Sequence, residues 1–256
     1  MVNSDQTWRI WHKDYLQFYD IAFLNFSKNW KIPKFVYGAS IGLDYWEFSK
    51  ETDKFAKSLL KNFTGISLRE TGAIKFVKDH LGINATFVLD PTMLIDKKYY
   101  INIINNYKNI LVNHSDFILI YKLDIMSNME SFIRRVHNQL NYTIYNIRLK
   151  DKDYIEKFLY GIYHCKAVIT NSYHGTLFAI IFNKPFIAFL KNTRGNERFK
   201  TIEELYGIRN RIFRKNQKPN LSLLTTPLKI NNNIIKYYKN ISLNYLRKNL
   251  NIQNSI

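Results

Sequence analysis

Short apolar segments alternate with amphipathic segments over most of this 256-residue chain, and this alternation restricts the fold more than any other feature. In the second half, four apolar segments are predicted to be buried strands, namely FILIYKL, YTIYNI, AVITN and FIAFL. The segments between them have apolar residues at helical spacing and helical length, about ten to fifteen residues. Strands that alternate with such helices predict βαβ units and therefore a parallel sheet.

The same alternation occurs between residues 35 and 94. The segment SKETDKFAKSLLKNF predicts a helix with Ser49 as its N-cap, and TGAIKFVKDHL predicts a helix that ends at Gly82. GISLR and ATFVLD are predicted to be strands, and Pro91 ends the second because it has no amide proton to donate to a sheet. We therefore predict an α/β fold with two Rossmann-like parallel-sheet halves.

The polar stretch at residues 96–116 is predicted to separate these halves. The N-terminal half then covers residues 1–110 and the C-terminal half residues 111–225. Residues 226–256 are predicted to form a basic tail of one or two amphipathic helices. A solvated helical face is the simplest interpretation of this tail, and contact with an anionic membrane surface is the alternative.

The chain has a formal net charge of +18, and such a field attracts phosphates, nucleic acids and anionic lipids. Its lysines and arginines are scattered rather than gathered in dense runs, so we expect no nucleic-acid partner. Cys165 is the single cysteine, which excludes an internal disulfide and suits a reducing compartment. No segment approaches the ~20 apolar residues of a membrane span, and no secretory signal is visible. We therefore expect a soluble, cytoplasmic protein.

The segment TNSYHGTLFA joins the predicted strand AVIT to an apolar helix. In doubly wound sheets, ligands bind at this position, where helix amides and the helix dipole favour anions. Ser172 and Thr176 add hydroxyl groups, and Gly175 would let a phosphate or carboxylate approach the backbone. His174 adds an ionisable ring. Alternatively, Ser172 caps the helix and His174 is an ordinary core or surface histidine, and the residues alone leave both interpretations open.

The longer segment TNSYHGTLFAIIFNKPFIAF resembles the signature of the polysaccharide pyruvyltransferase family, in which Ser-x-His-Gly precedes an apolar helix and Lys/Arg-Pro. Five further segments are similar to family motifs and occur in the family's order. They are NSDQTW, VYGASIG, GISLRE, VLDPTMLID and RGNERFKTIEELYGIRNRIF. The resemblance extends over residues 3–213, and six motifs in order are specific where a single one is weak.

This resemblance implies a glycosyltransferase-B-like fold, with the active site between the halves and the donor bound by residues 111–225. It also implies transfer of a pyruvyl group from phosphoenolpyruvate to two hydroxyls of a sugar, giving a cyclic ketal. The acceptor would belong to a bacterial surface polysaccharide or a lipid-linked intermediate. Phosphoenolpyruvate is a substrate, so no cofactor is expected.

Two residues match positions that the family associates with donor binding or catalysis, namely Arg69 in Ser-x-Arg-Glu and His174 in Ser-x-His-Gly. A guanidinium binds a carboxylate or phosphate bidentately, so we expect Arg69 to clamp the donor. An imidazole exchanges protons near neutral pH, so we expect His174 to act as an acid/base group or phosphate ligand.

Four more residues are predicted to bind substrates. Arg194 and Arg198 would contact phosphate, although exposed arginines in loops are more often solvated. Asp5 and Gln6 would touch the acceptor sugar, and a turn-capping role for Asp5 is equally compatible with the sequence. No metal site is expected, because the histidines show neither HxxxH nor Cys-rich spacing.

Two carboxylates near these motifs have competing interpretations. Glu70 is either an acid/base group or a partner of the dipole of the helix that follows it. Asp90 is expected to hold its loop by accepting amide hydrogen bonds.

The chain opens almost directly on NSDQTW, which lies well inside the first domain of related enzymes. We therefore expect an incomplete, N-terminally shortened first half in which VYGAS and ISLR have uncovered strand edges. Self-association or a partner chain would cover such edges.

Two other functions are compatible with the sequence. A nucleotide-sugar glycosyltransferase could use the same scaffold, but no acidic ribose-binding residue is recognisable at the end of a C-terminal strand. An inactive remnant that binds anionic glycans would fit an incomplete first half. A lipid-linked acceptor would place the enzyme peripherally at the inner face of the membrane.

Overall fold

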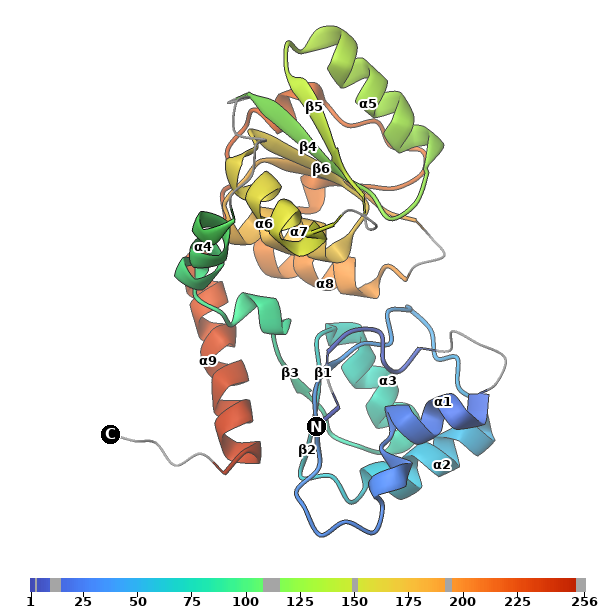
Figure 1. Ribbon diagram of the computed structural model, residues 1–256. Coiled ribbons are helices and arrows are strands. Elements are labelled where there is room, and N and C mark those ends of the chain that lie inside the picture. Colours follow the sequence, from blue (N-terminus) through green and yellow to red (C-terminus); the bar gives the residue numbers. More distant parts are fainter. Residues whose placement is uncertain (3, 10–14, 108–115, 149–151, 192–194, 252–256) are drawn as a thin grey trace. The chain divides into compact units, whose positions relative to one another are not determined.

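The structure is a computed structural model that describes residues 1–2, 4–9, 15–107, 116–148, 152–191 and 195–251. The chain forms two compact units (Figure 1). The first unit comprises Met1–Leu94, Arg194–Leu205 and Asn231–Ile256, and the second comprises Ile95–Thr193 and Tyr206–Ile230. This division differs from the predicted domains because two segments from late in the sequence pack into the first unit.

The first unit contains a parallel sheet with the strand order β1-β2-β3. Its strands are β1 (Phe35–Ala39), β2 (Gly65–Leu68) and β3 (Thr86–Phe87). They are connected through α2 (Lys50–Leu60) and α3 (Thr71–Leu81). As predicted, Ser49 caps α2 by accepting a hydrogen bond from an amide, and Gly82 ends α3 at a φ of +66°.

Helices cover both faces of this sheet (Figure 1). Val36 packs on the side of α1 (Tyr15–Ala22), α2 and α3. Phe35 and Tyr37 alternate with it and face α9 (Asn232–Asn249), where their rings lie 6.3 and 6.2 Å from that of Tyr245. The described part of the predicted tail therefore contains one long helix, and the apolar side of this helix completes the core of the first unit.

The expectation of uncovered strand edges is wrong for both segments. β2 lies between β1 and β3, so the segment ISLR has a neighbour on each side. The outer side of β1 pairs in parallel with Val2 and Asp5. The amide of Tyr37 donates to the carbonyl oxygen of Val2 at 3.0 Å, and that of Ser40 donates to Asp5 at 2.9 Å.

Strand β3 is shorter than the predicted strand ATFVLD. The amide of Val88 still donates to the carbonyl oxygen of Leu68, but the amide of Leu89 donates to the hydroxyl of Ser242 in α9. Asp90 then caps the 3-10 helix η2 (Pro91–Met93). The strand ends early because a distant helix supplies the next hydrogen-bond partner.

The second unit contains a five-stranded parallel sheet with the order β5-β4-β6-β7-β8. Its strands are β4 (Phe117–Tyr121), β5 (Thr143–Ile147), β6 (Ala167–Thr170), β7 (Phe186–Phe189) and β8 (Ile212–Phe213). Four of them are the predicted strands, and the two parallel sheets confirm the predicted α/β class with Rossmann-like halves.

Helices cover both faces of the second sheet. They include α5 (Ser127–Gln139), α6 (Tyr154–His164) and α7 (Tyr173–Ile181), and α4 (Lys97–Asn106) packs on α6 and α7. α5 shares one face with the 3-10 helix η6 (Leu221–Leu224), while α6 and α7 cover the other (Figure 1). Helix α8 (Glu197–Tyr206) precedes β8, but most of it packs in the first unit.

Candidate active site

The order of strands reverses next to β4 in the second unit. The chain runs from β4 to β5 on one side and then to β6 on the other side of β4. In doubly wound sheets, ligands bind at the carboxyl ends of the strands where this reversal occurs. The segment that carries His174 follows β6 directly, so the structure places it at this position.

Side-chain hydrogen bonds tie the turns after β4 and β6 together. The amide of Leu123 donates to Oδ1 of Asn171 at 2.7 Å, and Nδ2 of Asn171 donates to the carbonyl oxygen of Asp124 at 2.9 Å. The hydroxyl of Thr170 donates to the carbonyl oxygen of Tyr121 at 2.7 Å. These bonds fix the start of α7 relative to the neighbouring strand.

His174 is the second residue of α7. It is partly exposed, whereas its neighbours Tyr173 and Gly175 are buried. The ring of Tyr173 lies edge-on to the imidazole at a centroid distance of 5.6 Å. The first turn of an apolar helix therefore presents one ionisable ring at the reversal of strand order.

The three predicted substrate-binding residues near His174 are Ser172, Gly175 and Thr176. Each makes a hydrogen bond or a packing contact within the second unit. Oγ of Ser172 accepts from the amide of Gly175 at 3.3 Å, which confirms the predicted helix cap. A Cβ on Gly175 would lie 2.5 Å from Oγ1 of Thr170, so glycine lets α7 pack closely on β6. Thr176 is fully buried and donates to the carbonyl oxygen of Ser172. Their substrate-binding roles stay predictions, because these contacts already explain the residue types.

Two lysines near this edge were not singled out from the sequence. Lys122 follows β4 and pairs with Glu130, and Lys191 follows β7, with its Nζ 3.1 Å from Oδ1 of Asp124. Their side chains are 32% and 40% exposed. Lys122 is the sixth residue of the predicted strand FILIYKL, and Lys191 directly follows the predicted strand FIAFL, so their position near carboxyl ends was the signal that could have identified them.

Arg69 follows β2 in the first unit, and its side chain is 1% exposed. Its Nη1 donates to Oδ2 of Asp90 at 2.5 Å and to Oγ of Ser4 at 3.2 Å. Its Nη2 donates to Oδ1 of Asp5 at 2.9 Å. The two carboxylates differ in exposure, since the side chain of Asp90 is 1% exposed and that of Asp5 is 65% exposed. The predicted anion clamp therefore has carboxylate partners within its own unit.

Two carboxylates of this region, those of Asp90 and Glu70, hold loops. Asp90 also accepts from the amide and hydroxyl of Thr92, which confirms the predicted loop-holding role. Glu70 is fully buried and accepts from the hydroxyl of Ser40 and from the amides of Ile41 and Gly42. Its carboxylate thus stabilises the turn after β1 and makes no capping hydrogen bond to α3.

The first turn of α8 adds two buried charged groups to the first unit. The amide of Glu197 donates to the carbonyl oxygen of Gly42, and burial raises the pKa of its carboxyl group, with Glu70 and Asp44 adding to the shift. Arg198 is 7% exposed, with its guanidinium 6.0 Å from the ring centroid of Phe199. The expectation of a solvated loop arginine is therefore wrong for Arg198, because it lies in a packed helix.

The remaining predicted residues are Gln6 and Arg194. Gln6 is buried, and its Nε2 lies 2.0 Å from where a Cβ on Gly42 would stand. Gly42 has a φ of +77°, so only glycine fits this contact and this backbone conformation. Arg194 lies outside the described residues.

Residues 2–191 match the sequence model of the family described as polysaccharide pyruvyl transferase. The chain belongs to this family. No curated protein matches the chain. The matched range includes Arg69 and His174, whereas the segment RGNERF lies beyond its end.

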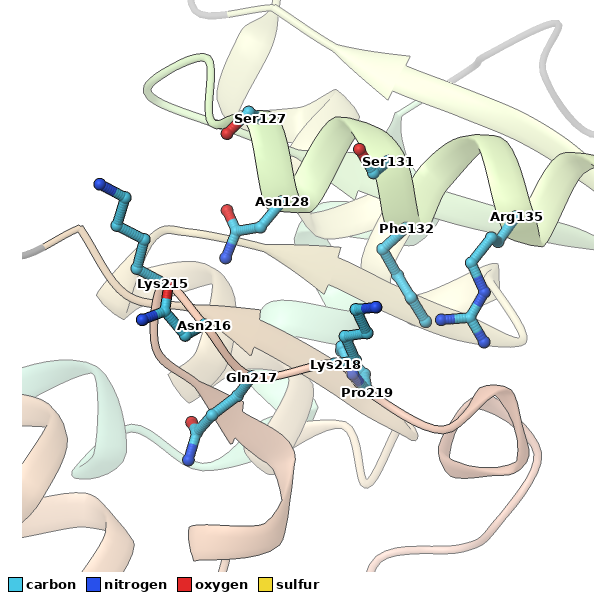
Figure 2. Close-up of a pocket in the computed structure, with 10 residues that line it drawn as sticks. All are labelled: Ser127, Asn128, Ser131, Phe132, Arg135, Lys215, Asn216, Gln217, Lys218 and Pro219. Carbon is cyan, nitrogen blue, oxygen red and sulfur yellow. The ribbon is translucent and has the colours of Figure 1, made fainter.

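A separate cleft of about 840 Å³ lies between α5 and residues 215–219 in the second unit of this transferase-family chain (Figure 2). It is lined by Ser127, Asn128, Ser131, Phe132, Arg135, Lys215, Asn216, Gln217, Lys218 and Pro219. None of the predicted site residues belongs to this set. Its lining has three cationic side chains and no carboxylate, so it favours an anionic ligand over a neutral one.

The described part of the chain contains no group of three or more His, Cys, Asp and Glu side chains suited to hold a metal ion. None of its helices combines the length and apolar character needed to cross a bilayer.

Proposed function

We propose that this family member transfers the pyruvyl group of phosphoenolpyruvate to two hydroxyls of one sugar. The products are a cyclic ketal and inorganic phosphate, and the acceptor is a surface polysaccharide or a lipid-linked sugar intermediate. The observation that carries the proposal is the position of His174, a partly exposed imidazole where the strand order reverses.

The reaction proceeds through two successive attacks by sugar hydroxyls. Protonation of the methylene carbon of phosphoenolpyruvate gives a methyl group and an oxocarbenium-like carbon, which the first sugar hydroxyl attacks. The second hydroxyl then displaces phosphate and closes the ketal. One of the two hydroxyl protons is matched by the proton gained at the methyl carbon, and the other leaves with phosphate.

We assign acid/base catalysis or phosphate binding to His174. Proton transfer by a positioned side chain contributes about 10² to 10⁴ in rate, and imidazole suits this role near neutral pH. The hydrogen bonds of Asn171 and Thr170 hold the backbone that carries the ring, which supports a fixed position for such a group.

We assign donor binding to Arg69. The buried carboxylate of Asp90 holds Nη1, while Asp5 is mostly exposed and pairs with Nη2. An incoming carboxylate or phosphate could take the place of the Asp5 carboxylate, which is 65% exposed, while Asp90 keeps Nη1 in position. Gln6, Ser172, Gly175, Thr176, Arg194 and Arg198 are weaker candidates for substrate contacts.

This proposal places the enzyme in the cytoplasm, at the inner face of the membrane when its acceptor is lipid-linked. The buried single cysteine Cys165 suits a reducing compartment.

The experiment is to incubate the purified chain with phosphoenolpyruvate and a panel of sugar diols. Phosphate release is measured together with the appearance of the ketal methyl group by proton NMR. Equal amounts of phosphate and ketal are expected. Turnover of nucleotide sugars without phosphoenolpyruvate would instead indicate a glycosyltransferase. If no acceptor gives turnover but phosphoenolpyruvate raises the thermal midpoint, the chain is a binding protein and the proposed activity is wrong.

A further inference from the structure

One short segment of the first unit exposes several large apolar side chains. Within residues 21–34, which we call the Trp30 loop, the exposed residues include Ile21 (69%), Phe26 (61%), Trp30 (54%) and Ile32 (56%). The rings of Phe26 and Trp30 meet edge-on with centroids 5.7 Å apart. Single exposed apolar residues are normal, but a group that includes two aromatic rings in one connection indicates a binding surface. The Trp30 loop includes the last two residues of α1 and leads to β1 (Figure 1).

Internal hydrogen bonds hold the Trp30 loop in this shape. Oγ of Ser27 donates to the carbonyl oxygen of Leu24 at 2.8 Å. Lys34 is 7% exposed, and its Nζ donates to the carbonyl oxygens of Ser27 at 2.8 Å and Lys28 at 3.3 Å. Burying an ammonium group is costly unless it is hydrogen-bonded, so these bonds fix the loop while Phe26 and Trp30 point outward.

The charge of the Trp30 loop selects among partners. Lys28 and Lys31 are exposed beside the aromatic pair, and residues 21–43 contain no aspartate or glutamate. The neighbouring carboxylate of Asp20 accepts a hydrogen bond from Nδ2 of Asn25 at 2.8 Å, so the two lysines outnumber it. Exposed aromatic and aliphatic side chains flanked by lysines fit the headgroup region of an anionic bilayer, where rings enter the interface and ammonium groups meet lipid phosphates. We infer that the Trp30 loop docks this protein on anionic lipid membranes.

The basic C-terminal helix lacks the apolar part of such a surface. Tyr245 packs on Phe35 and Tyr37, and the ring of Tyr238 lies 5.0 Å from that of Phe87. The large apolar side chains that are exposed in α9 and at its end are Tyr237, at 61%, and Leu250, at 50%. They lie more than three helical turns apart and form no group, whereas the Trp30 loop has four such side chains within twelve residues, and this difference favours the Trp30 loop as the docking element.

The test is co-sedimentation of the full chain with vesicles of phosphatidylcholine and phosphatidylglycerol in a two-to-one ratio. The double substitution Phe26→Ser and Trp30→Ser should weaken binding by about tenfold or more, because the rings no longer enter the interface. Lys28→Gln should weaken it about fivefold, from about 1 kcal/mol per lysine near the surface. Tyr237→Ser and Lys236→Gln are the matched controls on α9 and should leave binding nearly unchanged.

All substituted side chains are exposed, so each variant should keep the thermal midpoint of the parent protein. Equal vesicle binding by the parent and the Phe26/Trp30 variant would overturn the inference, as would an equal loss in the α9 controls. Analytical ultracentrifugation tests the main competing occupant. A parent dimer that becomes monomeric in the Phe26/Trp30 variant would show that the loop binds a second copy of the chain instead.

Discussion

Polar residues follow the parallel strands of both units. Those of the first unit are buried, whereas those of the second unit are partly exposed. In the first unit the polar residues Arg69, Glu70 and Asp90 are nearly or fully buried. Arg69, after β2, donates to Asp90, after β3, and Glu70 accepts from the amide of Gly42 in the turn after β1. In the second unit, His174 and Lys191 keep part of their side chains exposed. The first group is a buried network that holds three strand ends in place and meets solvent at the exposed carboxylate of Asp5, which pairs with Arg69. The second is an edge whose side chains a substrate can reach directly.

The largest expected effect is a loss of stability when the buried network around Arg69 is broken. Asp90→Asn leaves the buried guanidinium of Arg69 without its buried counter-charge, and breaking a buried pair costs about 3–5 kcal/mol. Urea unfolding measures this free energy. The matched control is Asp5→Asn, which should cost less than about 1 kcal/mol because that carboxylate is mostly exposed. Similar losses in the free energy of unfolding for the two variants would show that Asp90 is not the main counter-charge of the buried Arg69.

The next effect tests the packing beneath the open edge. Gly175→Ala places a methyl group 2.5 Å from Oγ1 of Thr170 and 3.0 Å from Cδ1 of Tyr121. Overpacking of this kind costs about 1–3 kcal/mol, and α7 should shift away from β6. Urea unfolding gives the cost. An unchanged stability would mean that Gly175 serves ligand approach rather than helix packing.

A smaller effect is expected at the cap of the same helix. Ser172→Ala removes the acceptor for the amide of Gly175 and should cost about 1 kcal/mol. Ser172→Asp, which keeps an N-cap acceptor, should restore most of this loss in the same urea measurement. A full loss in both variants would exclude capping as the role of this hydroxyl.

The smallest effect is a pH dependence in the first unit. The pKa of Glu197 is raised in the folded protein, mainly by burial, so the folded state binds more protons than the unfolded state as this group titrates. Stability should therefore fall as pH rises from the ordinary glutamate pKa through the raised value. Glu197→Gln should remove this fall and raise the thermal midpoint by a few degrees at neutral pH. An equal midpoint difference at pH 4 and pH 7 would contradict this assignment.

The local pattern of the sequence predicted the strands and helices well. Ser49, Gly82 and Ser172 act where their residue types predict caps, because a cap depends on neighbours in the chain. The alternation of apolar and amphipathic segments likewise predicted both parallel sheets.

Long-range partners were not predictable in the same way. The hydroxyl of Ser242 binds the amide of Leu89 and shortens β3, although no local signal links these residues. The buried pairing of Arg69 with Asp90 depends on a tertiary contact between two strand ends. The sequence places Lys122 and Lys191 near carboxyl ends of predicted strands, but the strand order was needed to show that these strands lie beside the point of reversal.

We propose that His174 at the open edge takes part in pyruvyl transfer. The most direct measurement is the kcat/KM for ketal formation in His174→Ala, with the exposed His137 of α5 replaced by alanine as the matched control. We predict a loss of about 10² to 10⁴ for His174→Ala with an unchanged thermal midpoint, and parental activity for His137→Ala. Parental kcat/KM in the folded His174→Ala variant would contradict the account.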